Sequence, residues 1–380
     1  DLSCHLRLAH RLQVALVVAL DPTCWTTPRD KIGIVASWRR LKQAMTNIEP
    51  TDTTVISKDH RTHSNLQAVL ESGQFAVTCE LGPPRVPDAA DVLEKASLLR
   101  GYVDAASCTD NQGAVLKMAN WGAAVLCRQV GLEPIMQLSC RDRNRLAIQS
   151  DVIAAHAFGV RNFMSISGDS LVLGDHPMAK PVFDLQGVQL VRLLKRIRDE
   201  GRTGAGDQID ADFGCFIGGA ANPFAPPYGW RPLRFLKKAE AGQQFALTQM
   251  IFNVDRFSEW MSRVCDEGLH ERIHVIAGVG PLKSVRMAEF MKFKIAGMEV
   301  PDKILDRMRA AAKPRREGIN ICLEIIEQVR EISGVHGVHI MAIDWEKVVP
   351  RIVERSGLLL PRPTLHRDAS RPIVEASPGP

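Results

Sequence analysis

Short apolar runs alternate regularly with longer amphipathic segments through most of this chain, and this alternation favours a fold of the α/β class. Several runs are apolar throughout, as expected for strands that are buried on both faces of a parallel sheet. Eight such runs occur, at residues 75–80, 103–110, 134–140, 162–169, 213–220, 245–252, 274–279 and 338–343.

Segments with helical character lie between these runs, at residues 89–99, 114–130, 142–158, 185–200, 232–241, 254–267, 283–294 and 317–332. Asp88 and Asn253 precede two of them as N-cap residues. Eight strand and helix pairs predict a (β/α)8 TIM barrel. The same alternation permits a doubly wound open sheet, but the Gly-x-Gly-x-x-Gly fingerprint of that fold is absent from the sequence.

The chain is longer than one barrel requires, since it has 380 residues and a TIM barrel takes about 250. We expect a single catalytic barrel at residues 65–360. Residues 1–64 are expected to be an N-terminal extension largely outside the fold, because the first 44 have no sustained periodicity and Met45 is placed like a natural start. Residues 361–380 contain five prolines and predict a flexible tail.

Charge and cysteine content exclude several classes of protein. A formal net charge of +5 is small for this length and indicates no nucleic-acid partner. The nine cysteines show neither Cys-x-x-Cys nor zinc-type spacing, which predicts a reduced cytoplasmic protein without a metal site. The longest early apolar stretch, residues 14–20, is shorter than the roughly 20 residues that cross a bilayer, so we expect no membrane association.

Polar residues stand where the barrel strands should end, which is where barrel enzymes carry their chemistry. Glu80 ends the first run before a Gly-Pro-Pro break, and Asp169 and Gln249 belong to the fourth and sixth runs. Each has a plainer interpretation: Glu80 as a helix cap or ion-pair partner, Asp169 as a turn residue, and Gly218-Gly219 as a tight strand exit instead of a phosphate or ring seat. Gln249 has apolar neighbours, so a buried amide there needs hydrogen-bonding partners, which a planar heterocycle would supply.

A series of motifs in this order resembles the methylenetetrahydrofolate reductases, from about residue 65 to residue 360. Each motif is weak alone, but their order and spacing together are specific. The motifs are Cys79-Glu80-Leu81-Gly82-Pro83-Pro84, Ser107-Cys108-Thr109-Asp110, Gln137-Leu138-Ser139-Cys140, Ser167-Gly168-Asp169, Ala241-Gly242, Thr248-Gln249-Met250-Ile251-Phe252 and Ile276-Ala277-Gly278-Val279-Gly280-Pro281.

The resemblance implies a (β/α)8 barrel that uses FAD to pass a hydride from NADH or NADPH to 5,10-methylenetetrahydrofolate, giving 5-methyltetrahydrofolate. The family's general acid falls on Glu80, and its pterin-binding aspartate and glutamine fall on Asp169 and Gln249. A general acid needs a raised pKa, which the apolar strand end around Glu80 should supply. The implied cofactor-binding residues are Thr109, Gln137, Ser167, Gly168, Asp169, Gly218, Gly219, Asn222 and Lys238.

The chain departs from the family on the flavin side. Ser167 replaces the arginine of Leu-Arg-Gly-Asp, Gln137 replaces a histidine, and residues 218–223 replace Tyr-Pro-x-x-His-Pro. These departures leave open FMN, or no flavin, in place of FAD. The alternative function is a flavin-independent, methyltetrahydrofolate-binding methyl-transfer component that acts with a corrinoid protein, and a third is a non-enzymatic folate-binding subunit. The resemblance also leaves room for a homo-oligomer or an electron-transfer partner protein.

Overall fold

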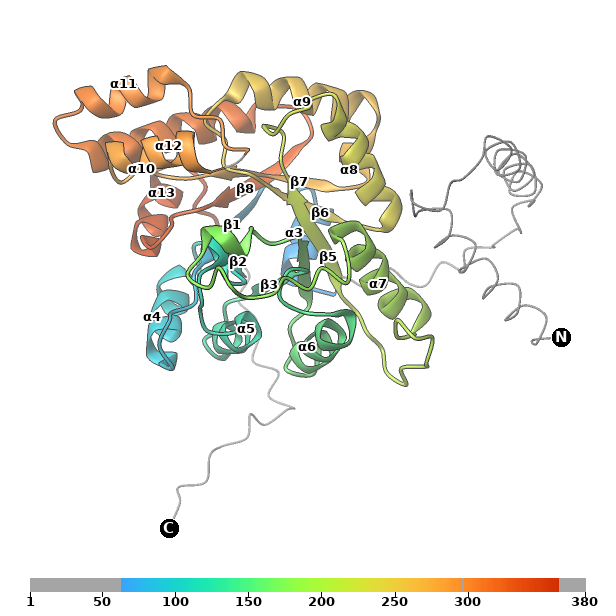
Figure 1. Cartoon of the computed structure of the whole chain (residues 1–380). Coiled ribbons are helices and arrows are strands. Elements are labelled where there is room, and N and C mark those ends of the chain that lie inside the picture. Colours follow the sequence, from blue (N-terminus) through green and yellow to red (C-terminus); the bar gives the residue numbers. More distant parts are fainter. Residues whose placement is uncertain (1–62, 296, 362–380) are drawn as a thin grey trace, which may run out of the picture. The chain divides into compact units, whose positions relative to one another are not determined.

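A computed structural model describes residues 63–361 except residue 296, and its eight parallel strands close into a barrel in chain order (Figure 1). The pairing of β1 with β8 excludes the open sheet and confirms the predicted TIM barrel. The strands are β1 (Ala76–Leu81), β2 (Ala105–Cys108), β3 (Pro134–Ser139), β4 (Asn162–Ile166), β5 (Phe216–Ala221), β6 (Phe245–Thr248), β7 (His274–Val279) and β8 (Val335–Ile340).

Helices cover the outside of this barrel. Eight match the predicted segments: α4 (Ala89–Leu99), α5 (Asn120–Gln129), α6 (Arg145–Ala157), α7 (Gly187–Glu200), α8 (Trp230–Ala241), α9 (Val254–Asp266), α10 (Val285–Lys294) and α12 (Pro314–Arg330). As predicted, Asp88 and Asn253 cap α4 and α9 with their side chains. The helix expected from residue 114 begins only at Asn120, because Gln112–Ala114 form a separate short 3-10 helix, η2.

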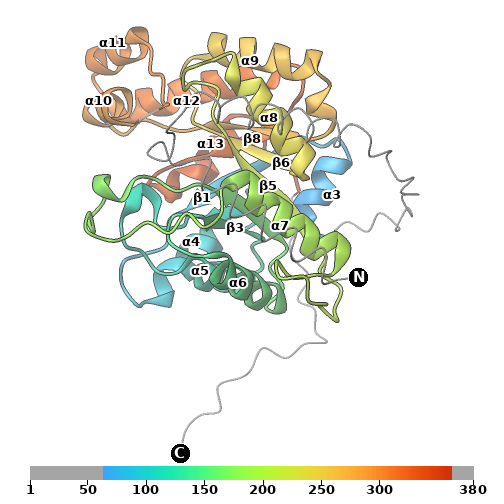
Figure 2. The same cartoon turned by 45° about the vertical axis from the view of Figure 1, so that its right-hand side comes forward.

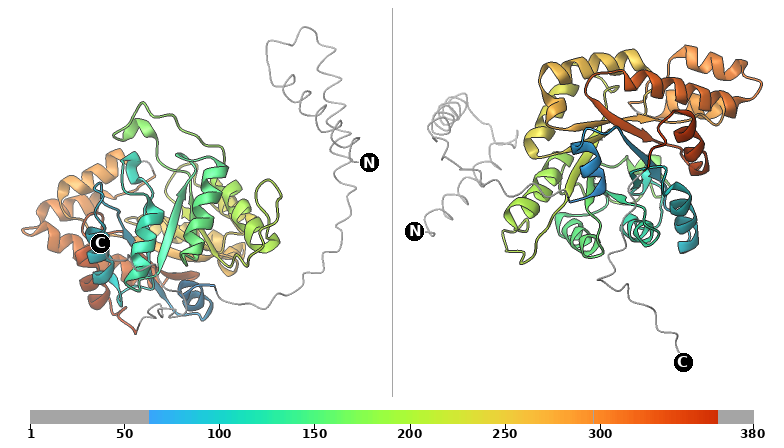
Figure 3. Two further views of the ribbon diagram at one scale, coloured as in Figure 1. Left: turned by 90° about the horizontal axis from the view of Figure 1, so that it is seen from below. Right: turned by 180° about the vertical axis from the view of Figure 1, so that it is seen from behind.

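Three further helices were not predicted: α3 (Asn65–Glu71), α11 (Asp302–Ala310) and α13 (Val349–Arg355). Helix α3 closes the N-terminal end of the barrel (Figure 3). There Leu66 and Leu70 pack in one cluster with inward-facing strand residues. Helices α10 and α11 project from one side of the barrel (Figure 1, Figure 2).

A buried carboxylate fixes helix α3 to the N-terminal end of the barrel. Glu133, just before β3, accepts hydrogen bonds from the backbone N–H of Asn65 at 3.1 Å and of Leu66 at 3.0 Å. The carboxylate therefore satisfies two N–H groups that the first turn of a helix leaves without intrahelical partners. Burial raises the pKa of Glu133 to about 7.

Alternate residues of each strand point into the barrel. In β1 the inward series is Ala76, Thr78 and Glu80, which places Glu80 nearest the C-terminal mouth. Thr78 forms a hydrogen bond of 2.9 Å with Nδ1 of His339 in β8. Burial lowers the pKa of His339 to about 3, so this imidazole is neutral in the barrel interior.

The extension and the tail expected at residues 1–64 and 361–380 fall outside the described residues, apart from Ser64, His63 and Pro361 at their edges. No helix in the described ranges is long and apolar enough to cross a membrane. The seven cysteines within residues 63–361 are all free thiols.

Candidate active site

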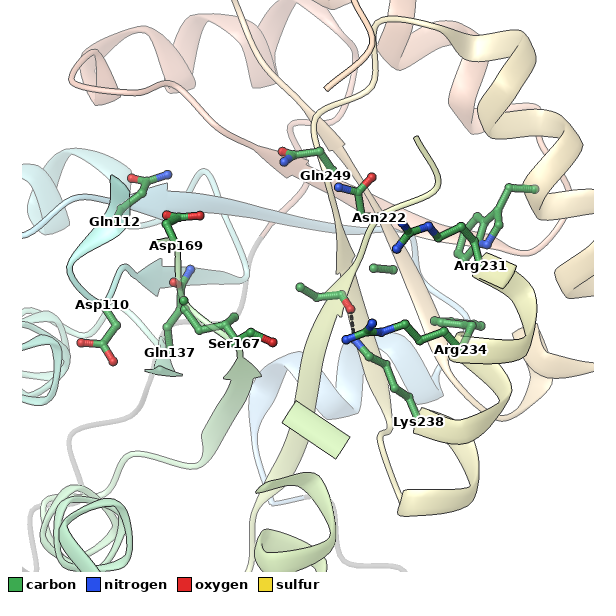
Figure 4. Close-up of a pocket in the computed structure, with 16 residues that line it drawn as sticks. Asp110, Gln112, Gln137, Ser167, Asp169, Asn222, Arg231, Arg234, Lys238 and Gln249 are labelled. Atoms are coloured by element: carbon green, nitrogen blue, oxygen red, sulfur yellow. Dashed lines mark hydrogen bonds between the residues drawn. The ribbon is translucent and has the colours of Figure 1, made fainter. Parts of the chain in front are cut away.

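A pocket of about 420 Å³ opens at the C-terminal end of the barrel (Figure 4). Seven of the predicted site residues line it: Gln137, Ser167, Gly168, Asp169, Asn222, Lys238 and Gln249. The other lining residues are Asp110, Gln112, Ile166, Ala220, Ala221, Arg231, Arg234, Phe235 and Trp260. Because strands β2 to β6 and their following loops all contribute, the pocket collects side chains that lie far apart in the sequence.

Glu80 lies beside this pocket, and Gln112 connects the two. Gln112 lines the pocket, and its Nε2 lies 3.4 Å from each carboxylate oxygen of Glu80. Burial raises the pKa of Glu80 to about 7; the hydrogen bond from Gln112 opposes this rise, and the nearby charges of Glu346 and Asp169 add to it. Such a carboxyl is partly protonated at neutral pH and is able to donate a proton.

The loop that carries Asp169 is tied to its neighbours on both sides. The Oδ2 atom of Asp169 accepts a hydrogen bond of 2.9 Å from the backbone N–H of Gly113. Behind it, the buried guanidinium of Arg141 donates to the carbonyl of Asp169 at 3.0 Å and forms a bidentate pair with Asp142 at 2.6 and 2.7 Å. Since bidentate arginine pairs fix geometry, the Asp169 carboxylate is held at a defined position at the mouth.

Gln249 follows β6 with its side chain oriented by its own backbone. Its Oε1 accepts a hydrogen bond of 2.9 Å from the N–H of Met250. The side-chain oxygen is thereby engaged, and the amide N–H groups remain for a ligand in the pocket. Gln137, which also lines the pocket, donates to the hydroxyl of Ser107 at 3.0 Å.

Helix α8 makes the side of the pocket that faces Asp110 and Asp169 positively charged (Figure 4). Arg231, Arg234 and Lys238 are spaced three and four residues apart, which places them on one face of the helix. Lys238 donates to the carbonyl of Ala220, and Arg231 donates to backbone carbonyls of residues 225 and 226. Burial, with a smaller effect of Arg234, lowers the pKa of Lys238 to about 8. An anion bound in the pocket would offset the repulsion between the positive charges of Lys238 and Arg234.

Three predicted cofactor-binding residues do not line the pocket. Thr109 is buried directly after β2. Gly218 and Gly219 lie deeper in β5, where a Cβ on Gly218 would overlap the ring of Phe245 and one on Gly219 would overlap the side chain of Gln243. Gly218 therefore permits close packing inside the barrel and Gly219 permits close packing against Gln243, and Ala220, Ala221 and Asn222 form this wall of the pocket.

Four polar lining residues were not assigned to the site from the sequence: Asp110, Gln112, Arg231 and Arg234. The signal for Asp110 was its place at the end of the second apolar run, and that for the arginines was their helical spacing from Lys238. Gln112 carried no comparable signal, because η2 and its approach to Glu80 depend on the folded loop. Among the described residues, no group of three His, Cys, Asp or Glu side chains is arranged to hold a metal ion.

Comparison with known sequences gives a consistent result. Curated relatives include methylenetetrahydrofolate reductase 2 of Schizosaccharomyces pombe, 26% identical over 263 residues, which covers 66% of this chain and 40% of the relative. A protein of Caenorhabditis elegans named probable methylenetetrahydrofolate reductase (NADPH) is 22% identical over 310 residues, or 78% of this chain and 44% of the relative. The chain thus spans less than half the length of these relatives.

A similar solved structure is an uncharacterized protein from Clostridium thermocellum that binds two copies of 5-methyl-5,6,7,8-tetrahydrofolic acid. Its TM-score is 0.55 at 12% identity, and the likeness covers 78% of this chain and 100% of that one, which supports the fold alone. The sequence profile of the family described as methylenetetrahydrofolate reductase matches residues 65–357, well over half of the sequence. The chain therefore belongs to the methylenetetrahydrofolate reductase family.

Proposed function

We propose that this chain reduces 5,10-methylenetetrahydrofolate to 5-methyltetrahydrofolate, with NADH or NADPH as hydride source, a flavin as carrier and Glu80 as general acid. The observation that carries the proposal is the Glu80 carboxyl, whose pKa is raised to about 7 at the mouth of a family barrel. Asp169 and Gln249 line the pocket beside it. The resemblance described above implies that these two residues bind the pterin.

Asp169 and Gln249 offer opposite hydrogen-bonding capacities to a pterin ring. The Asp169 carboxylate only accepts hydrogen bonds, and one of its oxygens accepts from Gly113, so the other oxygen would accept from the ring's amino and N–H groups. The Gln249 amide, with its oxygen engaged by Met250, donates to an acceptor on the ring. A ring held in this way would lie at the mouth near Glu80.

The pocket also suits a flavin nucleotide, preferably FAD. Lys238, Arg231 and Arg234 would hold its phosphates, because they bring positive charge into the pocket and Lys238 and Arg231 hydrogen-bond only backbone carbonyls among the described residues. Arg231 and Arg234 would supply the positive charge that is lost where Ser167 replaces the family's arginine. Gln137 and Ser167 would contact the ring system of the flavin. When bound, the flavin carries the hydride from the nicotinamide nucleotide to the folate.

Glu80 would supply the proton. With a pKa of about 7, roughly half of the carboxyl is protonated at neutral pH, so it can protonate the bridging nitrogen of the folate as the five-membered ring opens. Glu80 is partly exposed at the mouth, which lets it regain a proton from solvent between turnovers. If the chain is a reductase, Glu80 is therefore required for the half-reaction that reduces the folate and not for the oxidation of NAD(P)H.

The test compares the two half-reactions in Glu80→Gln. We expect folate reduction to be lost, while NAD(P)H oxidation with an artificial acceptor stays near the wild-type rate. Glu354→Gln, which removes an exposed carboxylate, serves as control and should keep both activities. An equal loss of both half-reactions would make Glu80 structural. A colourless purified protein that binds 5-methyltetrahydrofolate but takes up no flavin would instead favour the methyl-transfer alternative.

A further inference from the structure

A second carboxylate, Glu346, is buried behind the strand end that carries Glu80. It begins η5 (Glu346–Val348), the 3-10 helix that follows β8, and its side chain is only 7% exposed. Its Oε1 lies 3.7 Å from the position that a Cβ on Gly82 would occupy, and Gly82 is two residues beyond Glu80. The carboxylate thus contacts the turn that leads away from the proton donor.

Lys95 of α4 neutralises Glu346 only in part. The Nζ atom of Lys95 lies 2.9 Å from Oδ2 of Asp91 but 3.7 Å from Oε1 of Glu346, and it donates to the carbonyl of Gly82 at 3.2 Å. A separation of 3.7 Å is too long for a hydrogen bond. Lys95 therefore interacts with both Asp91 and Glu346 and does not fully neutralise them. The remaining negative charge is buried, where solvent screens it poorly.

We infer that Glu346 is a positioning residue whose buried charge beside Gly82, only partly neutralised by Lys95, increases the fraction of Glu80 that is protonated at neutral pH. The inference rests on the proposed role of Glu80 as proton donor. It agrees with the effect of Glu346 on Glu80, which raises the pKa of that carboxyl further than burial alone. Among the other charged or titratable groups around this pair, Asp169 also raises the pKa of Glu80, and both carboxylates raise the pKa of the Cys79 thiol. Lys95 interacts with Glu346 and also with Asp91 and Asp344.

The decisive variant is Glu346→Gln, which removes the charge and keeps the size of the side chain. We expect its rate of folate reduction at pH 8, relative to pH 6, to fall by a further factor of about 2 to 5, because less Glu80 remains protonated in alkaline solution. Glu346→Asp, which retains the charge, and the exposed control Glu354→Gln should keep the wild-type profile. Lys95→Met should move the profile in the opposite direction.

A second measurement is independent of catalysis. In unliganded protein labelled with 13C at the glutamate carboxyl, the signal lost in Glu80→Gln identifies Glu80, and its titration is followed directly. Glu346→Gln should make this signal titrate at a lower pH than in wild type. An unchanged titration, or a shift in the same direction for Lys95→Met, would overturn the inference even if folate reduction is intact. Absence of folate reduction in the wild type would overturn the proposed function and leave the titration as the test of this pair.

Discussion

Replacing Glu80 with glutamine is expected to stabilise the folded protein in alkaline solution relative to mild acid. The carboxyl has an ordinary pKa of 4.5 and a pKa of about 7 in the folded protein. The folded state therefore binds the proton more tightly than the unfolded state, so stability contributed by Glu80 is complete below about pH 4.5 and is lost as the pH rises through 7. At about 1.4 kcal/mol for each tenfold change in proton affinity, the loss approaches roughly 3 kcal/mol.

Urea denaturation of wild type and Glu80→Gln at pH 5 and pH 8.5 measures this term. The stability of the variant minus that of the wild type should be roughly 2 to 3 kcal/mol more favourable at pH 8.5 than at pH 5. Glu133 has a pKa raised to a similar value, but it is present in both proteins and cancels from the difference. A difference that is the same at both pH values would refute the reasoning, because the Glu80 carboxyl would then titrate alike in the folded and unfolded chains.

Three further predictions concern the pocket and its walls. Gln249→Ala should weaken binding of 5-methyltetrahydrofolate by about 1 to 3 kcal/mol in titration calorimetry, since a polar edge of the ligand loses its partner, and unchanged affinity would remove Gln249 from the site. Lys238→Met should weaken flavin reconstitution, followed by fluorescence, at least tenfold, whereas the exposed neighbour Lys237→Met should not; equal effects would place the phosphates elsewhere. Gly218→Ala should lower the unfolding free energy by about 1 to 3 kcal/mol through its clash with Phe245, yet leave flavin affinity of the folded protein intact.

The barrel was predictable because each strand and each long helix carries its own periodic signal. All eight strands lie where the apolar runs stand, although β8 begins at Val335, three residues before its run. Helix α3 escaped notice because it has only seven residues and is stabilised by Glu133, more than 60 residues away in the chain. Short elements of this kind depend on tertiary contacts, which local pattern does not encode.

The sequence predicted site residues that lie at the carboxyl ends of strands. Asp169 and Gln249 reach the pocket because the carboxyl ends of parallel strands meet at one edge. The glycines of β5 show the limit of this reasoning. A glycine permits close approach of some other group, and the sequence could not decide between a ligand and Phe245 of the neighbouring strand. Only the barrel's register, which pairs Gly218 with Phe245, resolves the question.

The separation of charges around the mouth follows from the closed barrel. The charges that act on Glu80 are negative, those of Glu346 and Asp169, whereas the cationic residues of the pocket belong to α8, after β5. In a closed ring of eight strands in chain order, β1 and β5 lie on opposite sides. A cation beside Glu80 would lower its pKa and leave it ionised at neutral pH, and a carboxylate beside Lys238 would compete with an anionic ligand. The same barrel mouth can therefore carry a protonated acid and an anion-binding site, provided that the two lie on opposite sides of the barrel.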